Sequence, residues 1–275
     1  MKRSVLVALS IILLCSLSAL PTTLVKAYYA GYETTNYQAT DAIVMDGAWS
    51  AGTWTYGGEW DDAAIPPNLP DNMHWRDKWT YPTPDIIEHY LIEFFADNTT
   101  DTGDYFEMCV DCHANGGSTP QTDDIKIYYS GQDNGTLIVY QGDGSGGWVE
   151  HPNYTIPDHV QVVNTISASP SNSTPHLIIE LTYDRLKFDV VGQGSDYSPW
   201  IRVAVYDANS STLAAWPPTD PDVPDDWGLE TGTMDTIPEA LTVVAVILLS
   251  SVAVVVSFYF LRKRPKTESY NLRKT

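Results

Sequence analysis

Cysteine and basic residues are scarce in this chain of 275 residues. Only three cysteines are present, and without a second C-x-x-C pair a zinc site would have too few ligands. Of the 15 Lys and Arg, six lie between residues 28 and 236, together with 33 of the 35 Asp and Glu, which gives this part a net charge of −27. Such a surface repels nucleic acid and anionic lipid, and it attracts cations.

Recognisable catalytic motifs are also missing. The chain contains no G-x-S-x-G, no H-E-x-x-H and no glycine-rich phosphate loop between a strand and a helix. Pairs of carboxylates are abundant, and this abundance makes any proposed glycosidase pair unspecific. We therefore expect a binding or structural protein rather than an enzyme.

Both ends of the chain carry targeting patterns. A basic start and an apolar run lead to a small-x-small pattern ending at Ala27, so residues 1–27 are predicted to be a secretory signal peptide. Near the other end, the uncharged segment 240–261 is long enough to cross a hydrocarbon core of roughly 30 Å as a helix. We expect one transmembrane helix at this position.

Charge and glycosylation patterns predict the orientation. The basic tail 262–275 is expected in the cytoplasm by the positive-inside rule, which leaves everything before the span outside the cell. This is the arrangement of a single-pass protein of the cell membrane. Five glycosylation sequons support an external glycoprotein: Asn98, Asn134, Asn153, Asn172 and Asn209.

Residues 28–216 are predicted to form one domain built of strands. Seven short runs alternate apolar and polar residues, and turn-forming residues bound each run. The runs are 89–95, 104–111, 124–129, 136–142, 159–166, 176–183 and 200–207. Because no long amphipathic helix accompanies them, we expect an all-β fold, an antiparallel β-sandwich. The Pro- and Asp-rich segment 217–239 is predicted to be an acidic stalk.

Four spaced patterns also resemble a known superfamily. They are IVMDGAWSAGTW followed by EWDDAA (43–64), ADNTTDTGDYFEMCVD (96–111), PQTDDIKI (120–127) and PWIRVAVYDAN (199–209). Together they are similar to the β-sandwich superfamily of family 9 carbohydrate-binding modules, DOMON domains and the haem-binding subunits of ethylbenzene dehydrogenase-type enzymes. This resemblance implies a sandwich fold, and it implies sugar, haem or no small ligand for different members.

The segment CVDCHANGG contains the C-x-x-C-H spacing of covalent c-type haem attachment. In that hypothesis Cys109 and Cys112 hold the porphyrin and His113 ligates the iron. The alternating pattern of the preceding strand, however, assigns Cys109 to one face and Cys112 to the other. The resemblance also points away from covalent attachment, because haem in that fold is held noncovalently. A small disulfide and two free thiols are the structural alternatives.

Acidic residues cluster before and after this segment. Hard oxygen ligands gathered at the rim of a sandwich are what Ca²⁺ requires, although solvated hairpin ends have the same composition. The spacing differs from an EF-hand because the closing Glu is missing. The candidate calcium ligands are Asp97, Asp101, Asp104, Asp111, Asp123 and Asp124.

Aromatic residues are plentiful outside the predicted membrane segment. Sugar rings stack on aromatic planes while acidic and amide groups bond their hydroxyls, so aromatics beside such groups are typical of glycan sites. The best local example is YQGDGSGGW, in which Tyr140 and Trp148 flank a glycine-rich turn. We predict a surface protein that binds a glycan or another surface component. A haem-binding electron-transfer protein and a structural envelope protein are the alternatives.

Overall fold

The computed structural model describes most of the chain between residues 28 and 233. The described ranges are 28–39, 43–49, 59–61, 63–82, 85–130, 135–151, 154, 157–190 and 198–233. They contain twelve strands and one short 3-10 turn, η2 (Pro224–Asp226). The strands are β1 (Glu33–Gln38), β2 (Met73–Thr80), β3 (Ile87–Phe94), β4 (Tyr105–Asp111), β5 (Asp124–Ser130), β6 (Thr136–Gly142), β7 (Trp148–Glu150), β8 (Val160–Ser167), β9 (His176–Asp184), β10 (Trp200–Asp207), β11 (Thr212–Trp216) and β12 (Gly228–Thr233).

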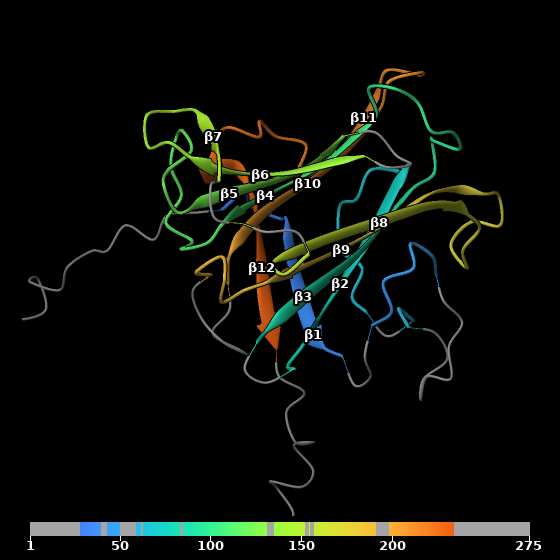
Figure 1. Ribbon diagram of the computed structural model, residues 1–275, viewed down its shortest axis with the longest axis horizontal. Coiled ribbons are helices and arrows are strands. Elements are labelled where there is room, and N and C mark those ends of the chain that lie inside the picture. Colours follow the sequence, from blue (N-terminus) through green and yellow to red (C-terminus); the bar gives the residue numbers. More distant parts are fainter. Residues whose placement is uncertain are drawn as a thin grey trace, which may run out of the picture.

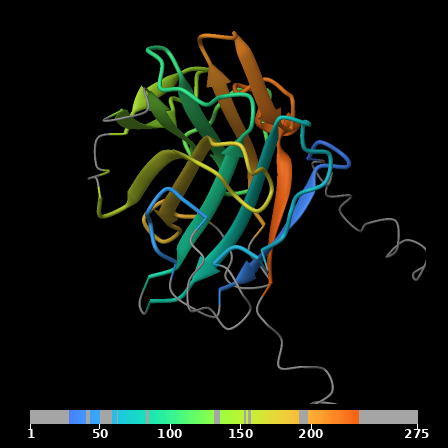
Figure 2. The ribbon, with the colours of Figure 1, turned by 90° about the vertical axis from the view of Figure 1, so that its right-hand side faces the viewer.

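All twelve strands belong to one sheet that curls back on itself. Its order is β7-β6-β5-β4-β10-β12-β1-β2-β3-β9-β8, and β11 pairs with β10. Figure 1 shows β4, β5, β6 and β10 above β2, β3, β8 and β9, so the two halves of the sheet face each other as the layers of a sandwich. In Figure 2 the neighbouring strands β1 and β12 run together along one side, where they join the two layers.

The prediction of strands was confirmed for all seven alternating runs, which became β3, β4, β5, β6, β8, β9 and β10. The prediction of a purely antiparallel sheet was wrong. Strand β1 runs parallel to both β12 and β2, and the connection from β1 to β2 spans residues 39–72. A crossover of that length is what a parallel pair requires, whereas a tight hairpin can join only antiparallel strands.

The predicted boundary at residue 216 also needs correction. Residues 217–233, predicted as the start of a stalk, instead return to the domain and add η2 and β12 to it. β12 pairs with β1 and β10 in the middle of the sheet, so its backbone groups are satisfied by the sheet rather than by water. The remaining part of the predicted stalk, 234–239, lies outside the described residues.

The other predicted segments also lie outside the described residues: the signal peptide 1–27, the membrane span 240–261 and the tail 262–275. Within the part of the chain that is described, no helix has the length and apolar character needed to cross a membrane.

The main core fills the space between the two layers. Phe106, Ile127 and Val203 point inward from one layer, and Ile92 and Leu181 point inward from the other. Burial of such apolar side chains contributes about 1.5–3 kcal/mol each and is the main force that holds the layers together. The core therefore accounts for the alternating pattern of these strands.

A buried polar cluster occupies the part of the interior beside β1 and β12. Glu230 accepts hydrogen bonds from the Tyr90 hydroxyl at 2.8 Å and from Asn36 Nδ2 at 3.0 Å. Arg185 pairs with Glu88. Burial and the neighbouring Glu230 carboxylate raise the pKa of Asp77 well above its ordinary value. This shift favours the neutral, protonated form of Asp77 in a cluster rich in carboxyl groups.

Candidate functional site

Cys109 in β4 and Cys112 just after its end point to opposite sides of the sheet, as the alternating pattern predicts. Cys109 is fully buried on the outer face with Trp200 and Trp227, and Cys112 is 1% exposed in the main core. Both thiols are free, so the disulfide alternative is not formed. Burial raises the pKa of Cys109 to about 12 and that of Cys112 well above its ordinary value. Both are therefore protonated and behave as small apolar side chains.

This arrangement does not fit covalent haem attachment. Two thiols that point to opposite sides of the sheet cannot both reach one edge of a porphyrin, and both are buried. His113 lies in the loop after β4, where its Nδ1 is 3.2 Å from Asp123 Oδ2. That loop is held by Asp111, which accepts hydrogen bonds from the backbone N–H groups of His113, Asn115 and Gly116. The C-x-x-C-H spacing thus arises from a strand end and an aspartate-capped turn.

Five of the six predicted calcium ligands fall into two groups. Asp101 and Asp104 lie with Asp207, a residue that the sequence analysis missed because it ends a distant strand, β10. Asp111, Asp123 and Asp124 form the second group. In each group, ligand oxygens of the three residues lie within 4.8 Å of one another.

Loop N–H groups already use many of these oxygens. Asp104 accepts from the backbone of Asp101 and Ala208, and Asp207 accepts from Asn209 and Ser210. Asp97 belongs to neither group and accepts from Thr99. These hydrogen bonds give the acids a structural role in closing turns, and calcium binding stays a prediction.

Tyr140 and Trp148, the two predicted ligand-binding residues, line one groove on the outer face of the layer that contains β4, β5 and β6. The other lining residues are Glu107, Lys126 and Tyr128, and the groove has a volume of about 290 Å³. Tyr140 projects from β6 and Trp148 from β7, and the turn between these strands is closed by Asp143, which accepts N–H bonds from Ser145 and Gly147.

The Trp148 side chain is held in a fixed orientation. Its indole N–H donates to Asp222 Oδ1 at 2.7 Å, and the ammonium of Lys126 lies 4.4 Å from the centre of its ring. The same Asp222 oxygen is 3.3 Å from Lys126 Nζ. Asp222 belongs to the segment that the sequence analysis assigned to a stalk. Sequence reasoning therefore missed this residue, which holds two side chains that line the groove.

Two further tyrosines, Tyr105 and Tyr206, extend this groove into a row across the sheet. Tyr206 of β10, Tyr105 of β4 and Tyr128 of β5 lie on the same outer face, with ring centroids 5.1 Å and 5.4 Å apart. The ring of Tyr140 is 6.5 Å from that of Tyr128 and turned by 69° to it. We call Tyr206, Tyr105, Tyr128, Tyr140 and Trp148 the aromatic row. Its members come from five strands, so only the strand order could reveal it.

The solved structure of a family 9 carbohydrate-binding module is similar to this chain. The module, from Caldicellulosiruptor kristjanssonii in complex with cellotriose, aligns with a TM-score of 0.48 at 10% identity over 74% of this chain and 95% of the module. A Bacteroides uniformis protein described as carbohydrate-binding aligns with a TM-score of 0.42 at 10% identity. The alignment covers 75% of this chain and 100% of that protein. No family model and no curated protein sequence matches.

The first of these neighbours is a family 9 carbohydrate-binding module, one of the groups that the four sequence patterns resemble. Both alignments have TM-scores below 0.5 and 10% sequence identity.

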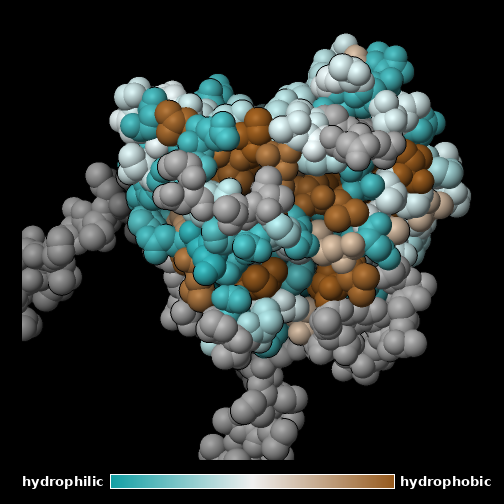
Figure 3. Space-filling model, viewed as in Figure 1, coloured by the Kyte–Doolittle hydropathy of each residue, from teal (hydrophilic) through white to brown (hydrophobic). Residues whose placement is uncertain are grey.

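A second concave region lies at the open side of the sandwich. This cleft of about 470 Å³ is lined by residues from several loops and from β5 and β6, among them His113, His151, Tyr154, His159 and Asp189. The ring of His151 stacks on that of Tyr154 with centroids 3.7 Å apart. Burial, and to a smaller extent the neighbouring His159, lowers the pKa of His151. Figure 3 shows patches of hydrophobic residues across the middle of the face that is viewed in Figure 1.

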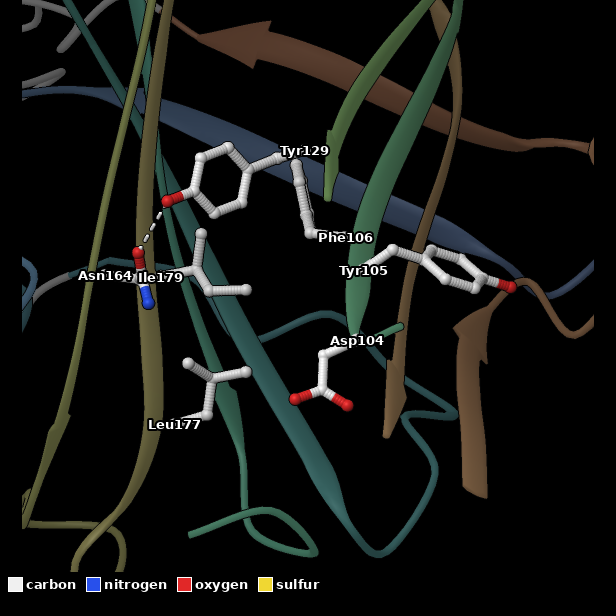
Figure 4. Close-up of a pocket in the computed structure, with 7 residues that line it drawn as sticks. All are labelled: Asp104, Tyr105, Phe106, Tyr129, Asn164, Leu177 and Ile179. Carbon is white, nitrogen blue, oxygen red and sulfur yellow. Dashed lines mark hydrogen bonds between the residues drawn. The ribbon is translucent and has the colours of Figure 1, made fainter. Parts of the chain in front are cut away.

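A small internal cavity of about 10 Å³ lies between the layers, beside Asp104 and Leu177. Figure 4 shows the Tyr129 hydroxyl donating to Asn164 Oδ1, a bond of 3.0 Å. The Asn164 Nδ2 group is buried and has no hydrogen-bond partner within the described part of the chain. A space of this size holds about one water molecule and is too small for an organic ligand.

Proposed function

We propose that this protein binds carbohydrate through the groove formed by Tyr128, Tyr140 and Trp148. The observation that carries the proposal is the meeting of these aromatic side chains with Glu107 and Lys126 around one open groove. Aromatic rings pack against the C–H faces of a sugar, while carboxylate and ammonium groups bond its hydroxyls. A volume of about 290 Å³ is at the small end of ligand sites, which suits one or two sugar rings.

Pre-organisation of the groove supports this proposal. Asp222 holds both Trp148 and Lys126, so neither side chain must be ordered when a ligand arrives. A site that is ordered in advance loses less conformational entropy on binding, which raises affinity.

We also propose that the domain is displayed at the cell surface by its C-terminal segment. The support comes from the sequence: the uncharged stretch 240–261, the basic tail 262–275 and the signal pattern in 1–27. The strong negative charge of the domain would keep the domain hydrated and soluble at the cell surface.

Binding can be tested with the full chain in a detergent that has no sugar headgroup. We expect retardation on gels that contain a soluble neutral polysaccharide, with glucans, xylan and mannan as separate probes. Tyr140→Ala and Trp148→Ala should each weaken affinity about tenfold, because each removes an aromatic contact surface. Tyr81→Ala is the matched control, since Tyr81 is 52% exposed and does not line the groove.

The proposal fails if no probe retards the wild-type chain, or if the Tyr81 variant loses as much affinity as the two groove variants. Circular dichroism and thermal melting of each variant would show that the compared chains are folded.

A further inference from the structure

The aromatic row continues beyond the groove, and its geometry bears on the shape of the ligand. Tyr206 is directly opposite Tyr105 across β10 and β4, and the row then crosses β5, β6 and β7. Neighbouring strands are about 4.8 Å apart. Each step of the row is therefore comparable with the length of one sugar unit in an extended chain.

The tyrosines of the row offer hydroxyl groups rather than ring faces at the end away from the groove. The rings of Tyr206 and Tyr105 are inclined by only 23°, and those of Tyr105 and Tyr128 by 28°, so these rings face one another. Tyr105 has a stacked ring on each side and is half-buried, so its edge is the part left at the surface. The ring of Tyr140 is turned by 69° to that of Tyr128 and lines the groove.

None of the hydroxyls of Tyr105, Tyr128, Tyr140 and Tyr206 makes a hydrogen bond to another described residue. By contrast, the buried Tyr90 hydroxyl donates to Glu230 and that of Tyr129 donates to Asn164. As far as the described residues go, the row thus carries four hydroxyl groups that are open to solvent or a ligand. A chain of sugar hydroxyls matches them in number and spacing.

The charges beside the row are balanced. Lys126 pairs with Asp222, and Arg202 pairs with Glu107 while its Nε donates to Thr219 O at 2.8 Å. Both of these cations are thus paired with acids, and the net charge of −27 between residues 28 and 236 repels an anionic ligand. Charge complementarity favours an uncharged ligand.

We infer that the aromatic row binds an internal stretch of a linear, uncharged polysaccharide, with successive sugar units lying near successive aromatic residues. This inference rests on the proposed function and adds the ligand's shape and charge. The groove at Tyr140 and Trp148 grips one or two units through ring faces, and the hydroxyls of Tyr128, Tyr105 and Tyr206 bond the units that follow.

Chain length is the variable that tests it. Calorimetric titration of the full chain with cello-, xylo- and laminari-oligosaccharides, from disaccharide to hexasaccharide, should show affinity rising with each added unit until the row is filled. Tyr105→Phe and Tyr206→Phe remove only a hydroxyl from half-buried rings and leave the stacking in place. Each should weaken hexasaccharide binding about threefold and leave disaccharide binding unchanged. Tyr37→Phe, on β1, is the control.

The possible outcomes separate the inference from the proposed function. Equal affinity for disaccharide and hexasaccharide would overturn the inference while the carbohydrate proposal survives. Tighter binding of polygalacturonate than of the neutral probes would overturn the uncharged ligand. Absence of binding to every probe would contradict both the inference and the proposed function. Affinity that grows with length and falls in the two phenylalanine variants supports the inference.

Discussion

The outer faces of the two layers differ in how far other described parts of the chain cover them. Over β3 and β9, part of the segment 43–63 lies on the sheet, and Trp60 is fully buried against Leu91 and Ile178. Over β4, β5 and β6, the described residues leave Tyr105, Tyr128 and Tyr140 half-exposed. Both faces carry aromatic side chains, but within the described ranges the chain covers the first and leaves the row on the second half-exposed. The difference separates aromatics that stabilise the fold from aromatics available to a ligand.

Hydrogen bonds hold the described part of 43–63, which we call the covering segment, against the outer face of β3 and β9. Glu180 of β9 accepts from the backbone N–H groups of Asp46 and Gly47, both at 2.7 Å, and from the Trp60 indole at 3.2 Å. Arg76 lies 4.7 Å from the centre of the Trp49 ring. The segment is thus held by a buried carboxylate and by packing, and it contributes stability rather than an accessible surface.

Replacing Trp60 gives the largest expected contrast between the faces. Trp60→Ala should lower the free energy of unfolding by about 3–5 kcal/mol, which corresponds to about 10 °C in melting temperature. It should leave glycan affinity unchanged in the folded fraction. Tyr140→Ala should do the reverse, with a stability change within about 1 kcal/mol. Thermal melts paired with gel retardation would measure both, and similar stability losses in the two variants would erase the distinction between the faces.

The pH dependence of stability tests the fastening of the covered face. Burial raises the pKa of Glu180 to about 7. The native state therefore holds a proton that the unfolded chain releases near its ordinary pKa of 4.5. This contribution to stability is fully present below about pH 4.5 and is lost as the pH rises to about 7.

Glu180→Gln should flatten that part of the stability curve. Urea unfolding at intervals from pH 4.5 to pH 7 would measure the slope, with Glu150→Gln as the control because Glu150 is exposed on β7. A slope that stays the same in the Glu180 variant would contradict the role given to this carboxyl. Asp77, whose pKa is also raised, leaves part of the slope in every variant.

The smallest expected effect concerns the uncovered face. Asp222→Ala releases Trp148 and Lys126, so the groove must be ordered on binding, and affinity should fall about fivefold with little change in melting temperature. Asp158→Ala is a charge-matched control at an exposed position away from the groove. Titration with the best polysaccharide probe would compare the two, and equal losses would show that only net charge matters.

Strand prediction from the sequence worked where one face of a strand is apolar. It missed β1 and β12 because their inward residues, Asn36 and Glu230, are polar and belong to the buried cluster. It missed β2 because Asp77 and Lys78 are buried there beside Trp79, which breaks the alternation. A buried polar network depends on partners from distant strands, and a single strand's pattern does not reveal it.

Only those residues of the candidate site that lie close together in the sequence could be predicted. Tyr140 and Trp148 flank one turn, so the hairpin of β6 and β7 brings them together without knowledge of the fold. The other row members required the strand order, and Asp222 required the return of the chain past residue 216. The faces of Cys109 and Cys112 were also predictable, because alternation along a strand is a local property.

Hydrogen–deuterium exchange of the full chain with and without a saturating neutral polysaccharide would test the central claim most directly. We predict slower exchange in β4–β7 and in residues 217–227, with no change in β2, β3 and β9 under the covering segment. Protection confined to the cleft of His113, His151 and His159 would contradict the assignment of the aromatic face as the binding surface.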